Sequence, residues 1–358
     1  MSSDTPAAAA LRAHGGLLAA ELAALGIDPD GIVDFSVNVN PYGPAPAVVE
    51  AGRRAAFDRY PDPTAWPLRQ AIARRIEVSP DRIVVGNGAA DLFWTLARVL
   101  LREGDPVQIV GPTFAELPAA ARAVGCAVTE WCARPEDGFA VDLAEVARLA
   151  QTARPRLLYL CAPNNPTGIH VCADAVAELA AALPGVTILL DQAFLGLSPF
   201  YRELAAPLPP SVVCVRSMTK DHAIPGLRLG YLVASAALAS ALESGHPPWM
   251  VSGPAQAAGL AALDEDAFTA SCRVRLLRDR DALADTLRAL GLAPVPSATT
   301  FFLLPVRDPS TLRTRLLRRG VLVRDCTSFG LPGYIRLAAR PAPDRARLVA
   351  ALRAELPC

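Results

Sequence analysis

Short apolar strands alternate with helical segments through the middle of the chain, and this alternation constrains the fold more than any other feature. Strand-like runs occur at residues 82–85, 106–110, 127–131, 157–161, 187–191 and 212–216. Helical patterns separate most of them, at residues 90–102, 117–124, 143–151 and 173–182. Strands joined by helices pair in parallel and carry helices on both faces, so we predict an α/β fold with a large, doubly wound, mostly parallel sheet.

The pattern changes after a strand at residues 231–234. A long helical stretch is predicted from about residue 254 to 290, followed by strands at 300–304, 321–324 and 334–338 and helices at 312–319 and 343–356. This order is typical of a smaller α+β unit, and a length of 358 residues favours two domains. We expect an N-terminal arm at 1–45, a large domain at 46–250 and a small C-terminal domain at 251–358.

The charge balance limits the classes of partner. Basic and acidic residues number 35 each, whereas proteins that bind nucleic acid or anionic membranes usually carry excess positive charge. The eight cysteines form no C-x-x-C pair and the four histidines are scattered, which favours reduced thiols and argues against a metal site. No apolar run is long enough to span a bilayer. These features predict a soluble, cytoplasmic protein.

A single lysine stands among the basic residues. Of the 35, only Lys220 is a lysine, and the other 34 are arginines. A guanidinium stays protonated, whereas a lysine amine can lose its proton and condense with an aldehyde. In a chain that otherwise uses arginine for positive charge, Lys220 is a candidate for covalent catalysis. A surface lysine kept by chance is the alternative.

Polar motifs follow the predicted strands, where ligands bind in open α/β sheets. The turn at 86–91, GNGAAD, opens a helix whose amides could hold a phosphate, although a simple helix cap is also possible. Asn165 follows the apolar strand at 157–161, in a proline-stiffened loop. Asp191 ends another strand, where a buried carboxylate would need a cation; a helix cap or structural ion pair is the alternative. Residues 216–231 could hold a phosphate beside Lys220.

The ordered set of motifs resembles the class I and II aminotransferases, which use pyridoxal phosphate. The motifs are Asn165, Asp191, Ser217-x-x-Lys220 and Arg228-x-Gly230, and the resemblance covers roughly residues 14–340. It implies a large doubly wound domain, a small C-terminal domain and a homodimer whose active sites use residues from both subunits. It also implies that Lys220 forms the Schiff base with the cofactor and that Asp191 pairs with the pyridine nitrogen.

The resemblance implies further contacts with the cofactor. Asn165 would bind the ring oxygen, and Phe114 would stack on the ring. Tyr60 resembles the tyrosine that reaches the phosphate of the neighbouring subunit. The phosphate would be held by Gly88, Ala89, Ala90, Ser217, Thr219 and Arg228. The cofactor serves as an electron sink, and Lys220, once released by the substrate, can act as general acid or base.

Two groups within this family are similar to the chain. Histidinol-phosphate aminotransferases share residues 38–44, NVNPYGP, and 60–62, YPD. The threonine-phosphate decarboxylases of cobalamin biosynthesis resemble it in residues 14–16, in 219–231, in Phe194 where aminotransferases usually have tyrosine, and in a second arginine at Arg340. The predicted reaction is decarboxylation of L-threonine O-3-phosphate to 1-aminopropan-2-yl phosphate. The alternative is amino transfer to 2-oxoglutarate.

The resemblance to the decarboxylases also implies the substrate contacts. Arg336 would clamp the α-carboxylate in a bidentate fork. His14 and Arg324 would hold the distal phosphate, with Asn38 nearby, and Gly15 and Asn165 would also contact the substrate. Surface charge is the alternative for Arg324 and Arg340, and a loop histidine is the alternative for His14.

Two features depart from the decarboxylase pattern. Gln192 stands where an acid usually follows the aspartate, and residues 323–333 resemble the aminotransferases as much as the decarboxylases. A non-catalytic, cofactor-binding regulatory protein is a third hypothesis. It is disfavoured because the segment before residue 45 is too short for a DNA-binding module.

Overall fold

The computed structural model describes residues 14–205 and 207–355. The first 13 residues of the predicted arm, and Leu356 at the end of the last predicted helix, lie outside this range. The chain separates into two compact units. We call residues 39–165 and 169–274 the sheet unit. The terminal unit consists of residues up to Asn38, residues 166–168 and those from Arg275 onward.

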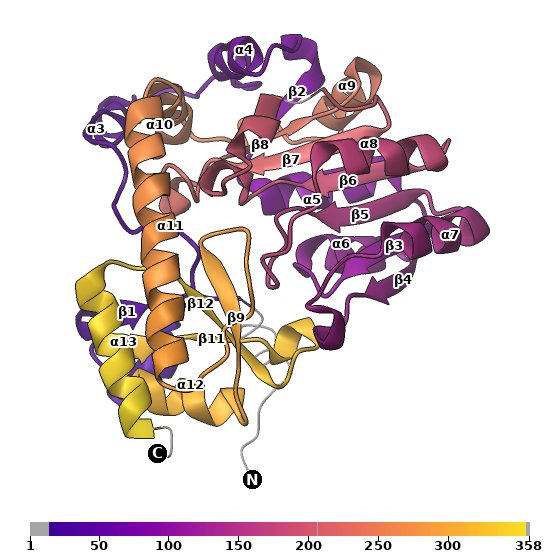
Figure 1. The fold of residues 1–358 in the computed structure, drawn as a ribbon. Helices are drawn as coiled ribbons and strands as arrows, with labels where there is room; N and C mark the ends of the chain where they lie inside the picture. The colour runs from indigo at the N-terminus through magenta and orange to yellow at the C-terminus, as the bar shows by residue number, and fades with distance from the viewer. Residues whose placement is uncertain (1–13, 206, 356–358) are drawn as a thin grey trace. The chain divides into compact units, whose positions relative to one another are not determined.

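A seven-stranded sheet forms the centre of the sheet unit (Figure 1). Its strands are β2 (Ile83–Gly86), β3 (Pro106–Gly111), β4 (Ala127–Cys132), β5 (Leu157–Cys161), β6 (Thr187–Asp191), β7 (Val212–Ser217) and β8 (Gly230–Val233), in the order β2-β8-β7-β6-β5-β3-β4. Strands β3 to β7 are parallel, and β8 runs antiparallel to both β2 and β7. The predicted doubly wound, mostly parallel sheet is therefore confirmed.

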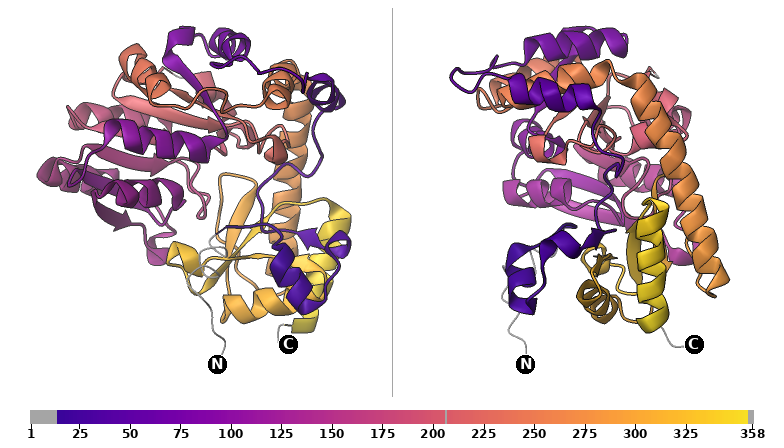
Figure 2. Two further views of the ribbon diagram at one scale, coloured as in Figure 1. Left: turned by 180° about the vertical axis from the view of Figure 1, so that it is seen from behind. Right: turned by 90° about the vertical axis from the view of Figure 1, so that its left-hand side faces the viewer.

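Helices cover both faces of this sheet, as Figures 1 and 2 show from opposite sides. One face packs against α5 (Ala89–Leu100), α6 (Glu116–Val124) and α9 (Ala236–Ser244). The other packs against α4 (Trp66–Arg75), α7 (Leu143–Ala153), α8 (Ala173–Ala182) and α10 (Gly253–Leu263), and α3 (Pro46–Arg54) packs on α10. Along β7, Val213 and Val215 join the α5 face and Val212 and Cys214 join the α8 face. This alternation directs Ser217 to the α5 face.

The terminal unit contains two small sheets. Strands β11 (Arg324–Asp325), β12 (Tyr334–Ala338) and β9 (Phe301–Pro305) form an antiparallel sheet, while β1 (Val33–Asp34) pairs in parallel with β10 (Val321–Leu322). Its helices are α2 (Ala19–Leu25), α12 (Pro309–Arg318), α13 (Ala342–Glu355) and most of α11 (Asp266–Ala289). The strand predicted at 321–324 is thus two short strands in different sheets.

The structure differs from the expected organisation at three places. The helix predicted at 254–290 is two helices, because three consecutive acidic residues beginning at Asp264 interrupt the apolar pattern between α10 and α11. The change of unit falls inside α11, after Val274, rather than after residue 250. Residues 14–38 belong to the terminal unit instead of forming a separate arm, since Phe35 is fully buried in that unit's core. None of the helices in the described ranges is long and apolar enough to cross a membrane.

Candidate active site

A glycine turn and an arginine form one end of the predicted cofactor site. Gly88 caps α5 with φ 84°, a conformation that disfavours any residue with a side chain. A Cβ atom at Gly88 would lie 2.7 Å from Nη2 of Arg228. The guanidinium therefore packs directly against the turn that leads into the first amides of the helix, those of Ala89 and Ala90. Backbone amides, the positive helix end and a guanidinium are the groups that bind phosphate.

The same turn is held by a carboxylate that the sequence analysis did not identify as a site residue. Oδ2 of Asp91 accepts one hydrogen bond of 2.9 Å from the Asn87 amide, and it also lies 2.8 Å from Nε2 of His246, with which it forms an ion pair or hydrogen bond. Burial alone would raise the pKa of Asp91, but these hydrogen bonds lower it. An ionised Asp91 thus fixes the loop before α5. His246 is 155 residues away in sequence, so no local pattern could have revealed it.

The end of β7 brings hydroxyls to this turn. Ser217 pairs with Gly230 on β8, which in turn pairs with Gly86 on β2. A Cβ atom at Gly230 would lie 3.0 Å from the Ala89 amide nitrogen, so only glycine permits this close approach. The Ser217 and Thr219 hydroxyls are 2.6 Å apart. The predicted phosphate-binding residues therefore lie together, and their donors fit the phosphate of the implied cofactor.

Asp191 ends β6 on the same face of the sheet. Its side chain is 2% exposed, and its two oxygens accept hydrogen bonds of 2.9 Å from the Tyr159 hydroxyl and the Ala193 amide. Burial raises the pKa of Asp191, while these two bonds, the Cys161 thiol and the charge of Lys220 oppose the rise. A buried carboxylate of this kind is stabilised by an adjacent cation, and a protonated pyridine nitrogen fits that requirement.

Tyr159 is a residue that sequence reasoning missed. Its hydroxyl is the one polar side-chain group in the otherwise apolar and thiol-containing run of β5, and this could have served as a signal. The ring is fully buried and contacts Phe93 edge to face at 5.9 Å. Burial, followed by the charge of Asp191, raises the pKa of Tyr159 well above its usual value. Tyr159 therefore stays protonated and donates to Asp191.

The remaining predicted cofactor residues lie on neighbouring loops. The Lys220 carbonyl accepts a hydrogen bond of 3.0 Å from the Asn40 amide, which anchors the loop that carries the lysine. Phe114 is half-buried against the core on the α5 face of the sheet. Asn165 is 6% exposed, directly after Asn164, whose side chain is bonded to the hydroxyl of Thr113 and the carbonyl of Pro112.

Tyr60 is placed differently from these residues. Its side chain is 78% exposed, and its ring stacks on Trp249 with 4.7 Å between the centroids. Most of its surface therefore faces solvent. Phe194, in contrast, is 5% exposed at the start of a short 3-10 turn after β6.

Two predicted substrate residues face each other in the terminal unit. Arg324 on β11 is the cross-strand partner of Arg336 on β12, and each is 5% exposed. Arg324 donates to the His14 carbonyl at 3.2 Å and to the Ser328 hydroxyl at 2.6 Å, and Arg336 donates to the Ser36 carbonyl at 2.6 Å. Burial lowers the pKa of both, that of Arg336 to about 10. Neighbouring buried cations favour the binding of anionic groups.

A cavity of about 290 Å³ in the terminal unit is lined by His14, Gly15 and Arg324. Gly15 is required there, because a Cβ atom would lie 2.4 Å from the Ser36 carbonyl oxygen. Asn38 is 5% exposed, and within the described part of the chain neither polar atom of its side chain has a hydrogen-bond partner. Such buried donors and acceptors are usually satisfied, which indicates that a ligand or water completes them.

Comparison with known proteins shows the family of the chain. A family model described as aminotransferase class I and II matches residues 30–354. The chain is 36% identical over 331 residues to histidinol-phosphate aminotransferase of Symbiobacterium thermophilum, with 91% of each chain covered. It is 36% identical over 353 residues to threonine-phosphate decarboxylase of Salmonella typhimurium, with 95% of this chain and 96% of that protein covered.

A solved structure is similar over nearly the whole chain. The histidinol-phosphate aminotransferase from Sinorhizobium meliloti, in complex with pyridoxal-5'-phosphate, covers 99% of both chains with a TM-score of 0.83 and 25% identity. The predicted fold type and cofactor are therefore confirmed. This chain belongs to the class I and II aminotransferase family of pyridoxal-phosphate-dependent enzymes.

Proposed function

We propose that this enzyme decarboxylates L-threonine O-3-phosphate, releasing carbon dioxide and 1-aminopropan-2-yl phosphate. The observation that carries this proposal is the cross-strand pair of Arg324 and Arg336, two buried cations in register. Like charges directly opposite each other are destabilising, and a ligand with two anionic groups offsets that cost. Threonine phosphate carries a carboxylate and a phosphate, whereas histidinol phosphate has a phosphorylated alcohol in place of the carboxylate and so carries a single anionic group.

Amino transfer to 2-oxoglutarate is the second candidate, and the same arginine pair supports it. The two carboxylates of 2-oxoglutarate could bind these arginines, one to Arg324 and the other to Arg336. The relatives include proteins named for either reaction at 36% identity, so similarity alone favours neither.

The residues have distinct roles in the proposed reaction. Arg336 binds the α-carboxylate through its planar fork, and Arg324 binds the phosphate together with His14 and Asn38. Pyridoxal phosphate, when bound, accepts the electron pair left on Cα after a bond breaks. Asp191 keeps the ring nitrogen protonated, and the Lys220 amine returns a proton to Cα. Phe194 offers no hydroxyl to the ring oxygen.

A paired assay tests the reaction. The holoenzyme is mixed with L-threonine O-3-phosphate, and carbon dioxide and the amino-alcohol phosphate are quantified, with Lys220→Ala as control. In parallel, histidinol phosphate and 2-oxoglutarate are supplied and glutamate is measured. Catalytic carbon dioxide release supports the proposal. Glutamate formation without carbon dioxide release would replace it with the second candidate.

We also propose that the enzyme is a homodimer. Phe57, Tyr60 and Trp249 are 82%, 78% and 45% exposed, and Tyr60 stacks on Trp249. Exposed aromatic groups of this kind are typical of protein–protein interfaces. Sedimentation equilibrium should give twice the chain mass of 37.7 kDa, and replacing Tyr60 and Trp249 by serine should shift the protein toward monomer. A wild-type mass of one chain at micromolar concentration would contradict this.

A cytoplasmic location is proposed as well. The cysteines within the described residues are free thiols, which suits a reducing compartment. Cell fractionation with antibody detection tests this, and recovery of the protein in an extracytoplasmic fraction would disprove it.

A further inference from the structure

The sheet unit contains a second polar cavity, of about 320 Å³. Arg216, Gln192 and Tyr231 line it, together with Asp221, His222 and Arg273. The end of β7 at Ser217 and Met218 also borders this cavity, but side-chain alternation on β7 directs the Ser217 side chain to the α5 face and Arg216 to the α8 face. Alternation along β6 likewise places Asp191 and Gln192 on opposite faces. The cavity therefore adjoins the same edge of the sheet as the predicted cofactor site, and Arg216 enters it from the opposite face.

Arg216 is the unusual residue of this cavity. It is 5% exposed, and its Nε donates to Oε1 of Gln192 at 2.9 Å. Its guanidinium also lies over the Tyr231 ring, 5.9 Å from the centroid. Nη1 is buried and has no hydrogen-bond acceptor among residues 14–205 and 207–355. Gln192, itself 4% exposed, is a neutral amide, so it satisfies one donor without balancing the charge.

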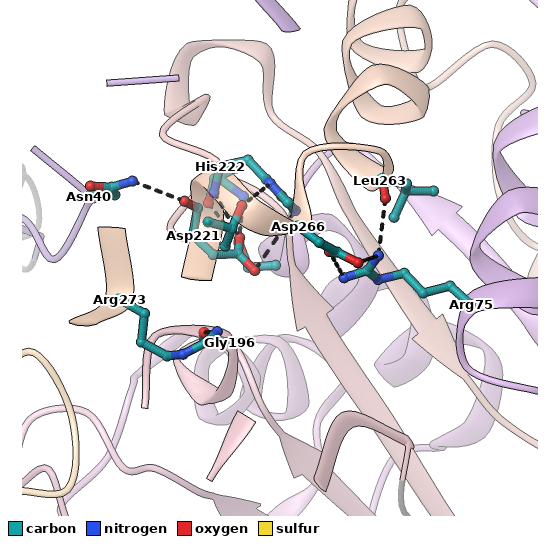
Figure 3. Close-up of polar contacts among 11 residues, drawn as sticks. Asn40, Arg75, Gly196, Asp221, His222, Leu263, Asp266 and Arg273 are labelled. Carbon is teal, nitrogen blue, oxygen red and sulfur yellow. Dashed lines mark hydrogen bonds and ion pairs between the residues drawn. The ribbon is translucent and has the colours of Figure 1, made fainter. Parts of the chain in front are cut away.

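The other two arginines of the cavity have hydrogen-bond partners, as Figure 3 shows. Arg75 is bonded to both carboxylate oxygens of Asp266 and to the Leu263 carbonyl. Arg273 donates to the Gly196 carbonyl at 3.0 Å and lies 3.4 Å from the centre of the Tyr201 ring.

Asp221 is the remaining acid. Its Oδ2 lies 4.0 Å from Nε2 of His222, whose Nδ1 is 3.5 Å from the Thr269 hydroxyl. Three arginines and two aspartates line the cavity, which leaves one excess positive charge when His222 is neutral. A buried, incompletely bonded guanidinium in such a cavity is costly unless an anion enters.

We infer that this cavity binds a small oxyanion, a carboxylate or a phosphate group, with Arg216 as its principal ligand. A planar guanidinium matches the geometry of oxyanions and distinguishes them from a spherical halide. The site goes beyond the proposed reaction, because the side chains of Arg216 and Gln192 lie on the face of the sheet opposite the side chains of Asp191 and Ser217. A bound anion would stabilise the end of β7 and the loop that leads from it to Lys220.

Calorimetric titration of the pyridoxal-phosphate-loaded enzyme tests this inference. Sodium phosphate, sodium acetate and sodium chloride are titrated separately at constant ionic strength, and thermal melting is followed in the same buffers. The decisive variant is Gln192→Glu, which supplies Arg216 with a carboxylate from within the chain. Gln151→Glu, at an exposed position on α7, adds the same charge elsewhere and is the matched control.

We expect saturable binding of phosphate or acetate to the wild-type enzyme. Its affinity should fall at least tenfold in Gln192→Glu and stay unchanged in Gln151→Glu, because Gln192→Glu removes about one charge-assisted contact with the anion. Gln192→Glu should also melt higher than wild type without added anion. Comparison of phosphate with acetate identifies the preferred group. Anion bound at Arg324 is unaffected by this change, so only the component lost in Gln192→Glu reports on the cavity.

Two outcomes would overturn the inference. One is equal anion binding by wild type and Gln192→Glu, and the other is no saturable binding by wild type. If Gln192→Glu fails to retain cofactor absorbance, Arg273→Gln replaces it and should weaken oxyanion binding, while unchanged affinity would refute the site.

Discussion

Replacing Tyr159 by phenylalanine removes one of the hydrogen bonds that hold Asp191 ionised. The Tyr159 hydroxyl donates to Oδ2 at 2.9 Å, and the ring is fully buried. Phenylalanine keeps the ring and its edge-to-face contact with Phe93, so the variant tests the hydroxyl alone. A hydrogen bond to a charged group contributes about 1.5–3 kcal/mol. This corresponds to roughly 10- to 140-fold in the preference for the ionised carboxylate.

The expected effect on the cofactor follows from this preference. In the proposed site a protonated pyridine nitrogen would bind next to ionised Asp191, so cofactor binding would lose the same free energy. Since the Ala193 amide and the Cys161 thiol still donate to Asp191, we expect the lower end of the range, about a tenfold rise in the dissociation constant of pyridoxal phosphate. Equilibrium dialysis against the apo-enzyme measures this constant directly.

Tyr201→Phe is the control for this experiment. The Tyr201 hydroxyl lies 3.4 Å from Nε of Arg202, and the variant keeps the ring beside Arg273. If Tyr159→Phe binds the cofactor within twofold of wild type, or if Tyr201→Phe loses as much affinity, the role assigned to the Tyr159 hydroxyl is wrong.

Four further changes test other parts of the site. Lys220→Ala should abolish turnover and the absorbance of covalently held cofactor, and residual turnover above background would exclude Lys220 as the catalytic lysine. Arg324→Gln should raise KM for a phosphorylated substrate by about 10- to 100-fold, with little effect on its unphosphorylated analogue; equal effects would show a structural role. Gly88→Ala should weaken cofactor binding more than Gly104→Ala, because both have φ above 80° but only the Cβ at Gly88 would meet a guanidinium; equal affinities would contradict this. Burial raises the folded-state pKa of Asp191 above its unfolded value. The stabilising contribution of Asp191 to the apo-protein is therefore present below the unfolded pKa and is lost as pH rises through the folded pKa. Thermal melting temperatures of wild type and Asp191→Asn should diverge across that pH range.

Much of the fold could be predicted from local sequence patterns. Alternating apolar strands and helices indicated the parallel sheet, because the crossover helices between strands leave a continuous signature along the chain. The predicted boundaries were least accurate where tertiary contacts decide them. Residues 14–38 looked like an arm, yet β1 pairs with β10, almost 300 residues later. No pattern within β1 itself could indicate that pairing.

The candidate cofactor residues were predicted from their order along the chain rather than from any single motif. Lys220 stood out because it is the only lysine, and Asp191 because it ends an apolar strand. Their positions at the carboxyl ends of parallel strands follow from the sheet topology, so sequence was sufficient to group Asp191, Ser217 and Lys220.

Only the tertiary structure decided which partners these residues have. Tyr159 meets Asp191 from a neighbouring strand, His246 meets Asp91 from across the chain, and Arg216 meets a neutral Gln192 on the opposite face. Such contacts depend on strand register and on side-chain direction, which are set when distant segments pack together. The sequence by itself therefore determined the family, the fold and the cofactor, because these depend on local periodicity and on the order of motifs. The electrostatic environment of each group depended on packing and required the folded structure.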